Sequence, residues 1–245
     1  MLARIRRSWV AAVDPVLGQF VRERRQLMPA PYPLAIYRRL LEDLIEAGAE
    51  LPAFSAAGDG GGGSVYVRHD VDTADCVKHL EDTIAVDRAL GVSSGVYFRL
   101  DAEDYDFGSV AARASELASQ GFEVGLHTSC YDYEDPLRRF SWESDRFETL
   151  TGFRARSFTL HGLGRKSHFS RLRFRRYMAR HLGEFGYAFS DCHRSLRQYR
   201  YVIEDCHIGS PDGTRFIYDD FENGARLIRP GTDLLVLTHP CYWRA

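Results

Sequence analysis

The feature that most constrains the fold is an alternation of short apolar segments with longer segments of helical periodicity, which runs through most of the 245 residues. Six segments of four to six residues have the composition of buried strands: Val65–His69, Gly95–Leu100, Phe122–Leu126, Ser157–Leu160, Tyr187–Ser190 and Leu234–Thr238. Five further stretches have the periodicity or composition of helices: 33–47, 74–90, 108–120, 137–150 and 170–184. Because parallel strands need crossover connections, this alternation predicts an α/β fold with a parallel sheet, open or closed into a barrel.

Composition and charge narrow the class of protein. The hydrophobic fraction is 44% and the charged fraction 27%, which is ordinary for a globular domain and excludes a disordered chain or a coiled coil. The net charge is −2, so the general basic excess of a nucleic-acid binder is missing and no nucleic-acid partner is expected. We expect residues 1–32 to be an N-terminal extension and residues 33–245 to form a single domain.

Cysteine usage and hydropathy predict the compartment. The five cysteines are an odd number without C-x-x-C spacing, which indicates reduced thiols in a cytoplasmic protein. The apolar run Trp9–Val13 has five residues, fewer than the roughly 7–15 of a signal peptide. A membrane span needs about 18 apolar residues in a row, and no such stretch exists, so no transmembrane segment is expected.

Side chains that bind metals or transfer protons follow five of the predicted strands. These residues are Asp70 with Asp72, His127, His161, Asp191 and His239. In α/β barrels and open α/β sheets, functional sites lie at the carboxyl ends of the strands. The sequence therefore predicts that these side chains share one catalytic face.

The residue types suit metal-assisted hydrolysis. One carboxylate and two imidazoles are a common catalytic zinc set that leaves a position open for water. A second carboxylate can take a proton from the water, and a separate histidine can protonate the leaving group. Asp70 and Asp72 share a face if the strand continues through them and can take different roles if it turns. Asp72 could also cap the following helix, which would explain only one of the two.

Four motifs in order resemble those of the polysaccharide deacetylases, carbohydrate esterase family 4. They are Val67–Asp72 (the branch with D-x-D), Gly125–Ser129, Phe185–Tyr187 with Ser190–Asp191, and the final L-x-H at Leu237–His239. The resemblance covers roughly residues 65–240 and implies a distorted (β/α)7 barrel. It also implies a divalent-metal-dependent hydrolase, with zinc as the expected ion, that removes N- or O-linked acetyl groups from a carbohydrate or sugar precursor.

The resemblance also implies roles for individual residues. Asp70 would be the general base, His239 the general acid, and Asp72 and His127 metal ligands. Tyr131 stands where the family has its second histidine, so His161 is the preferred third ligand. Asp132 and Glu134 are fallback ligands. Three residues are expected to support the site or bind substrate: Arg156, Asp191 and Tyr131. Arg156 lies near the place of the family's R-x-P-Y motif, which is missing here.

Several alternatives remain open at this point. The chain could be a catalytically degenerate deacetylase-fold protein that binds glycan or a partner without turnover, or another barrel metallohydrolase such as an amidohydrolase. The basic helix 165–181 carries seven Lys or Arg residues and no acidic one, which fits either a solvated face or a guide for an anionic ligand. Four aromatic residues could stack on sugar rings or belong to the core: Tyr105, Tyr131, Tyr133 and Trp142. We expect His69 to pack beneath the site.

Overall fold

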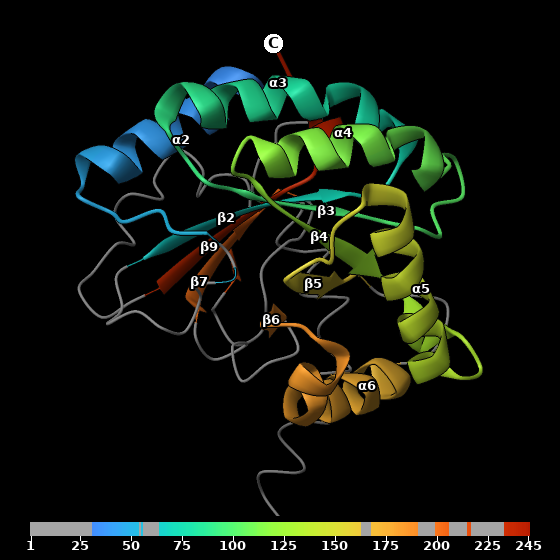
Figure 1. The fold of residues 1–245 in the computed structure, drawn as a ribbon. Coiled ribbons are helices and arrows are strands. Elements are labelled where there is room, and N and C mark those ends of the chain that lie inside the picture. Colours follow the sequence, from blue (N-terminus) through green and yellow to red (C-terminus); the bar gives the residue numbers. More distant parts are fainter. Residues whose placement is uncertain are drawn as a thin grey trace, which may run out of the picture.

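The protein is described here from a computed structural model, which describes residues 31–53, 55, 64–162, 168–190, 199–205, 215–216 and 233–245. Almost all of the expected extension 1–32 lies outside these residues, as does most of the glycine-rich segment before Ser64. Within them the chain forms an α/β fold around one parallel sheet, as the alternating pattern predicts (Figure 1).

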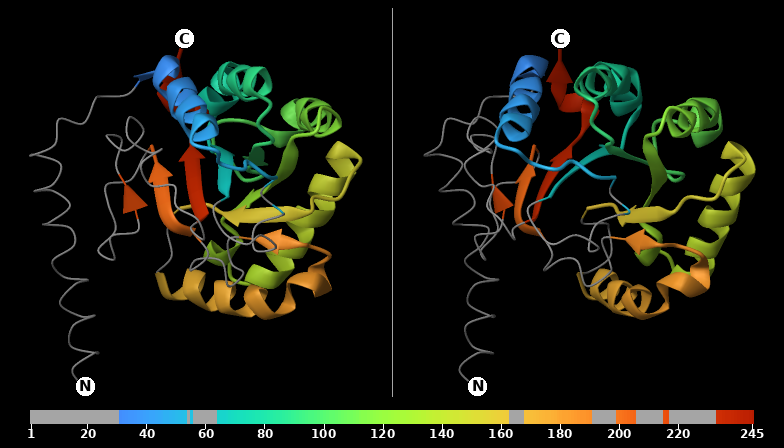
Figure 2. Two further views of the ribbon diagram at one scale, coloured as in Figure 1. Left: turned by 90° about the vertical axis from the view of Figure 1, so that its left-hand side faces the viewer. Right: turned by 60° about the vertical axis from the view of Figure 1, so that its left-hand side comes forward.

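The sheet is curled, with helices on its outer side (Figure 2). The final long strand, β9, pairs in parallel with β2, the first strand of the sheet, as the last and first strands of a barrel do. Among the described residues, β6 and β8 are the two edges and do not pair with each other. In sheet order the strands are β6 (Phe189–Ser190), β5 (Ser157–Leu160), β4 (Glu123–Thr128), β3 (Gly95–Phe98), β2 (Val65–Val71), β9 (Asp233–Thr238), β7 (Tyr199–Glu204) and β8 (Arg215–Phe216).

The helices end where local signals in the sequence place their caps. Thr73 accepts a hydrogen bond from the backbone of Cys76 at the start of α3, and Gly91 ends that helix with a φ of 67°. Gly152 ends α5 in the same left-handed conformation. The helices are α2 (Leu34–Glu46), α3 (Ala74–Leu90), α4 (Phe107–Ser119), α5 (Pro136–Thr151) and α6 (His168–His181). These bounds confirm the predicted helices, except that the last turn of the segment 170–184 is the 3-10 helix η3 (Leu182–Phe185).

Two clusters of apolar side chains fill the space between helices and sheet. The larger is aromatic and lies under α4, α5 and α6, where Phe107 stacks on Phe147 and Phe140 contacts Phe158. The smaller lies under α2 and includes Trp243, whose strand β10 (Trp243–Arg244) pairs with β1 (Tyr32–Pro33). Burial of these apolar side chains holds the helices on the outer face of the sheet. The polar side chains described below lie at the strand ends.

His69 packs into the protein behind the strand ends, which confirms the expectation for it. Its imidazole is fully buried and contacts Thr238 Oγ1 at 2.5 Å and Asp87 Oδ2 at 2.7 Å. Asp87 also accepts hydrogen bonds from the hydroxyl groups of Tyr37 and Ser94, each at 2.5 Å. This buried network joins α2, α3 and the central strands, and it lies apart from the candidate site described below.

The strands differ from the predicted segments in ways that matter for the site. β2 continues to Val71 and β4 to Thr128, so that Asp70 and His127 belong to the strands themselves. Between the predicted strands Tyr187–Ser190 and Leu234–Thr238, the structure adds β7, which is an integral strand beside β9.

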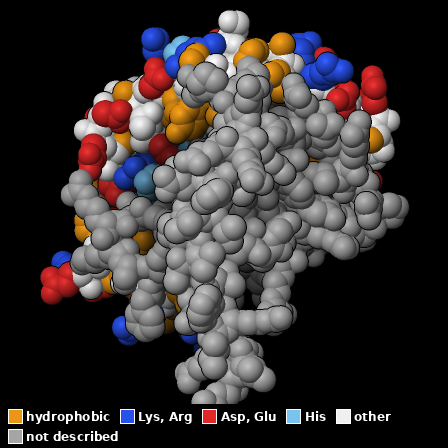
Figure 3. Space-filling view, turned by 180° about the vertical axis from the view of Figure 1, so that it is seen from behind, with side chains coloured by type: hydrophobic (Ala, Val, Ile, Leu, Met, Phe, Trp, Pro, Cys, Tyr) orange, Lys and Arg blue, Asp and Glu red, His pale blue; other side chains and the backbone are white. Residues whose placement is uncertain are grey.

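The surface of the described part carries mixed charge. On the face opposite to that of Figure 1, acidic and basic side chains are interspersed along the upper edge (Figure 3). On α6, Arg173, Arg176 and Arg180 are exposed to solvent. None of the helices in the described ranges has the length and apolar character that crossing a membrane requires.

Candidate metal centre

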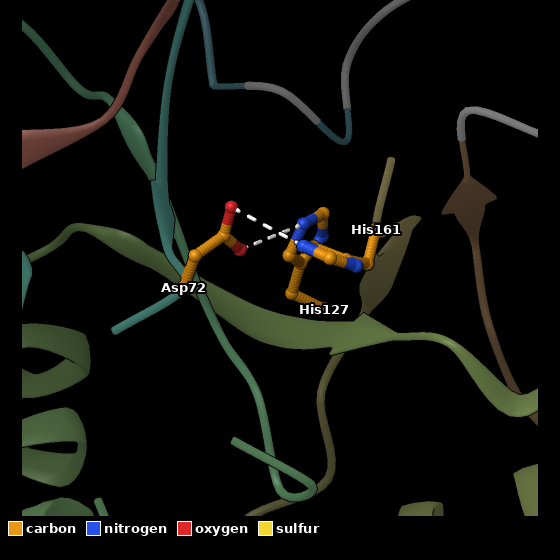
Figure 4. A group of neighbouring side chains, drawn as sticks. All are labelled: Asp72, His127 and His161. Atoms are coloured by element: carbon orange, nitrogen blue, oxygen red, sulfur yellow. Dashed lines mark ion pairs between the residues drawn. The ribbon is translucent and has the colours of Figure 1, made fainter. Parts of the chain in front are cut away.

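Three predicted ligands meet at the carboxyl ends of β2, β4 and β5. The side chains of Asp72, His127 and His161 point toward one another (Figure 4), and one ligand atom from each lies within 4.8 Å of the others. His127 Nε2 is 3.2 Å from one carboxylate oxygen of Asp72, and His161 Nε2 is 3.5 Å from the other. The structure thus brings together the three residues that the sequence assigns to the metal.

Neighbouring strands hold His127 in a defined orientation. Its Nδ1 lies 2.6 Å from the hydroxyl oxygen of Thr159, the residue paired with it on β5, and the side chain is buried. A neutral imidazole with its Nδ1 hydrogen directed at Thr159 presents the Nε2 lone pair to the site, which is the arrangement typical of a metal ligand. Thr159 was not predicted from the sequence, because a threonine within a buried strand carries no signal of this role.

Asp72 is a partly buried carboxylate next to three imidazoles. Burial alone would raise its pKa, but the surrounding imidazoles of His127, His161 and His239 lower the pKa well below the ordinary range. Its Oδ1 is buried and makes no hydrogen bond of good geometry within the described part of the chain. A buried anionic oxygen without a donor is unfavourable, and a cation bound between it and the imidazoles would satisfy it. The donor set of two imidazoles and one carboxylate fits Zn²⁺.

Asp70 lies beside this group as a second carboxylate. Arg68 donates to both of its oxygens, at 2.8 and 2.5 Å, and His127 Nε2 is 3.6 Å from Oδ2. Burial raises the pKa of Asp70, but the neighbouring Arg68 and His127 side chains outweigh this effect, so the net direction is downward. Because residues two apart on a strand share a face, Arg68 reaches Asp70 directly. This arginine lies within the motif Val67–Asp72, but nothing in the sequence indicates a role for it.

His239 approaches the site from β9. Its Nε2 lies 3.4 Å from Asp72 Oδ2, and its Nδ1 lies 2.7 Å from Asp205 Oδ1. The other oxygen of Asp205 accepts hydrogen bonds from the backbone of His239, at 2.6 Å, and from the indole of Trp243, at 2.9 Å. Asp205 is buried and fixes the imidazole ring, with its Nε2 pointing to the site. Asp205, too, was not predicted from the sequence.

Tyr131 supports the loop that carries His161. Its ring is buried, and its hydroxyl group donates to the backbone carbonyl oxygens of His161 and Gly162. The expected supporting role fits this geometry, whereas a stacking role on a sugar does not, because the ring has almost no accessible surface. Arg99 Nη1 lies 3.4 Å from His161 Nε2, and Arg99 itself pairs with Asp101.

Some predicted residues do not join the site. The expectation for Arg156 is wrong: this exposed residue precedes β5, so it lies at the amino end of the strand whose carboxyl end leads to His161. Its carbonyl group accepts hydrogen bonds from Ala188 and Phe189. Asp191 lies outside the described residues. The fallback ligands Asp132 and Glu134 are not part of the cluster of potential ligands, and Glu134 is exposed.

The aromatic residues near the strand ends divide into two groups. Tyr105 joins Tyr131 in a structural role, since its hydroxyl group donates to the carbonyl of Val71 and accepts from the backbone N–H of Arg99. Tyr133 and Trp142 have exposed fractions of 38% and 51%. The guanidinium of Arg139 lies 4.1 Å from the ring centre of Tyr133 and 4.5 Å from that of Trp142. Arg139 therefore covers one face of each ring, and the rest of each ring is partly exposed to solvent.

Comparison with known proteins adds no assignment. No model of a protein family matches the chain, and a search of curated proteins found no match.

Proposed function

We propose that the protein is a divalent-metal-dependent hydrolase that removes N- or O-linked acetyl groups from a carbohydrate or sugar precursor, on a barrel of the polysaccharide deacetylase type. The observation that carries the proposal is the convergence of Asp72, His127 and His161 with two further proton-transferring groups at one edge of the sheet. The motifs that resemble that family supply the substrate class.

The three ligand residues define what a metal would contribute. Bound by Asp72, His127 and His161, a divalent ion such as Zn²⁺ would lower the pKa of a water molecule and polarise the acetyl carbonyl group. The chain's own contribution is to hold two imidazole nitrogens and one carboxylate oxygen in fixed positions. The hydrogen bond of His127 to Thr159 and the bond of Tyr131 to the backbone of His161 support that geometry.

Asp70 and His239 divide the proton transfers. Asp70 is kept anionic by Arg68, so it can accept a proton from the attacking water. His239 presents Nε2 to the site and can donate a proton to the departing amine or alkoxide, while Asp205 holds the opposite nitrogen of the ring. Hydrolysis of an amide or ester needs one group that accepts a proton and another that donates one. Asp70 and His239 have separate environments that suit these two roles.

Two surface features outside this cluster could bind a sugar or a negatively charged group. Tyr133 and Trp142 offer exposed rings on which the apolar face of a sugar could stack. The exposed arginines of α6 would favour a substrate or partner with negative charge, although they identify no particular ligand.

Acetate release tests the proposal. Purified protein loaded with Zn²⁺ or Co²⁺ would be incubated with N-acetylated and O-acetylated oligosaccharides, and acetate would be measured by an enzyme-coupled assay. We expect release by the wild type and a loss of at least about a hundredfold in Asp70→Asn and His239→Gln, in line with the usual contribution of a general acid or base. Arg156→Ala is the matched control and should retain activity. Metal binding without acetate release from any of these substrates would favour the alternative of a degenerate barrel that binds glycan.

A further inference from the structure

A guanidinium group that the proposed proton transfers do not use lies beside the candidate ligands. Arg99 directly follows β3, and β3 lies between β2 and β4 in the sheet, so Arg99 leaves the same edge as Asp72 and His127. Its Nη1 lies 3.4 Å from Nε2 of His161. The side chain of Arg99 is 15% exposed, so it is shielded from most of the solvent and still accessible to a small group.

Asp101 holds the guanidinium of Arg99 in a defined orientation. Nε of Arg99 donates to Oδ1 of Asp101 at 3.1 Å, and Nη2 lies 3.1 Å from the same oxygen. The other oxygen of Asp101 accepts a hydrogen bond from the hydroxyl group of Ser129, which directly follows β4. Two of the three guanidinium nitrogens are therefore bound by Asp101, and the third, Nη1, is directed at His161. Because Asp101 offsets the charge of Arg99, the pair does not exclude a cation from the neighbouring ligands.

The contact between Arg99 and His161 competes with metal binding for the same lone pair. A guanidinium N–H can only donate, so Nη1 directs a hydrogen at the lone pair of His161 Nε2. This Nε2 is the ring nitrogen that faces Asp72, and a nitrogen that ligates a metal has no lone pair left to accept a hydrogen bond. Nη1 has no other contact among the described residues. In the metal-bound protein its hydrogens are therefore available to a ligand beside the metal residues.

We propose that Arg99 is a catalytic residue whose Nη1 stabilises the negative charge that develops on the acetyl oxygen; this inference rests on the proposed function. Attack of water forms a bond between its oxygen and the acetyl carbon, a proton passes to Asp70, and one electron pair of the C=O bond moves onto the acetyl oxygen. Arg99 donates a hydrogen bond to that oxygen. When the C=O bond re-forms, the bond to the amine or alkoxide breaks and the leaving group takes a proton from His239.

The type and the setting of the side chain suit this role. Arginine stays charged at every pH at which the protein would work, so it donates irrespective of the protonation of its neighbours. A donor that is fixed before the reaction stabilises a developing oxyanion without the cost of reorganisation, and the contact with Asp101 fixes Arg99 in this way.

Acetate binding tests the proposal without any need for turnover. Acetate carries on its oxygens the negative charge that the reaction places on the acetyl oxygen. The protein loaded with Co²⁺ would be titrated with sodium acetate at constant ionic strength, and the visible absorption of Co²⁺ would report binding. We expect the dissociation constant of acetate to rise about ten- to a hundredfold in Arg99→Gln, the loss expected for a hydrogen bond to a charged group, while Co²⁺ is still bound. Arg113→Gln, which removes an arginine paired with Glu81 and Glu116 on the outer helices, is the control and should retain wild-type values.

A second variant separates the geometry of Arg99 from its charge and from folding. Arg99→Lys keeps a positive charge beside Asp101, but its single ammonium group cannot contact Asp101 and also present a donor at His161. We expect this variant to fold and bind Co²⁺ as the wild type does and to lose acetate affinity as Arg99→Gln does. Equal acetate affinity in the wild type and both variants, or a loss of Co²⁺ binding in both variants, would overturn the proposal.

Kinetics separate this inference from the proposed function. If the wild type releases acetate, kcat should fall about a hundredfold or more in Arg99→Gln, with a smaller change in KM, as for other oxyanion donors. A higher KM with an unchanged kcat would overturn the catalytic role. A wild type that binds Co²⁺ and needs Arg99 to bind acetate, yet releases no acetate from any substrate, would contradict the proposed function and leave Arg99 as a residue that binds a carboxylate at this site.

Discussion

Replacing Asp205 with asparagine removes the charge that holds His239 and changes the size of the side chain very little. In the wild type, the carboxylate meets three donors: the backbone N–H and Nδ1 of His239, and the indole N–H of Trp243. An amide group has only one oxygen to offer, and its NH₂ group would face N–H donors instead of accepting from them. The imidazole would lose both its charged partner and its fixed orientation.

The size of the effect follows from the strength of these bonds. A hydrogen bond to a charged group contributes about 1.5–3 kcal/mol. If that amount is lost from the transition state, where His239 donates its proton, the rate falls about ten- to a hundredfold, since about 1.36 kcal/mol corresponds to a factor of ten. The loss should appear in kcat more than in KM, because Asp205 acts on the reaction through the orientation of His239.

Asp87→Asn is a closely matched control. Asp87 is a buried carboxylate that also meets three donors, among them His69 at the same 2.7 Å that joins Asp205 to His239. Both variants should lower the free energy of unfolding, by about 1–3 kcal/mol each, in urea denaturation. Only Asp205→Asn should lower the rate of acetate release per folded molecule. Equal rates in Asp205→Asn and wild type, or an equal loss of rate in Asp87→Asn, would refute the role assigned to Asp205.

Three further variants test other contacts. Arg68→Gln removes the charge that lowers the pKa of Asp70, so the acid limb of the pH–rate profile should move to higher pH; an unchanged profile would exclude Asp70 as the titrating base. Tyr131→Phe removes the hydroxyl group that holds the backbone of His161, and Co²⁺ affinity should fall by roughly two- to tenfold, a change that calorimetric titration would detect or exclude. Gly125→Ala would place a Cβ 2.5 Å from a backbone oxygen on β5, so the free energy of unfolding should fall by about 1–3 kcal/mol; retention of wild-type stability in urea would show that the strands can separate.

Much of the fold could be predicted because its signals are local. The helix 74–90 has Thr73 at its start and Gly91 at its end, and the structure confirms both caps. The strand Ser157–Leu160 is a short apolar segment with the observed bounds. The sequence shows which polar residue follows each predicted strand. Because parallel strands end at one edge of the sheet, Asp72, His127 and His161 could be expected to meet there.

The residues that were missed depend on pairing between distant segments. Asp205 follows β7, and the position of β7 beside β9 is set by the sheet order and leaves no mark in the local sequence. Thr159 acts because the register places it opposite His127. The error for Arg156 has the opposite cause: its distance along the chain from the motifs suggested the site, but it precedes its strand and therefore lies at the other edge of the sheet.

Metal content shows directly whether Asp72, His127 and His161 form a metal site. Wild type, His127→Ala, His161→Ala and the control His79→Ala, whose imidazole pairs with Asp75 and Asp82 on the outer helix α3, would be reconstituted with Zn²⁺, dialysed and measured by mass spectrometry of the metal. We expect about one ion per chain in wild type and His79→Ala and a loss of the ion in both site variants, because three ligands are needed for a catalytic zinc site. A wild type that retains no metal after reconstitution, or site variants that bind Zn²⁺ as well as the wild type does, would contradict the assignment of Asp72, His127 and His161 as metal ligands.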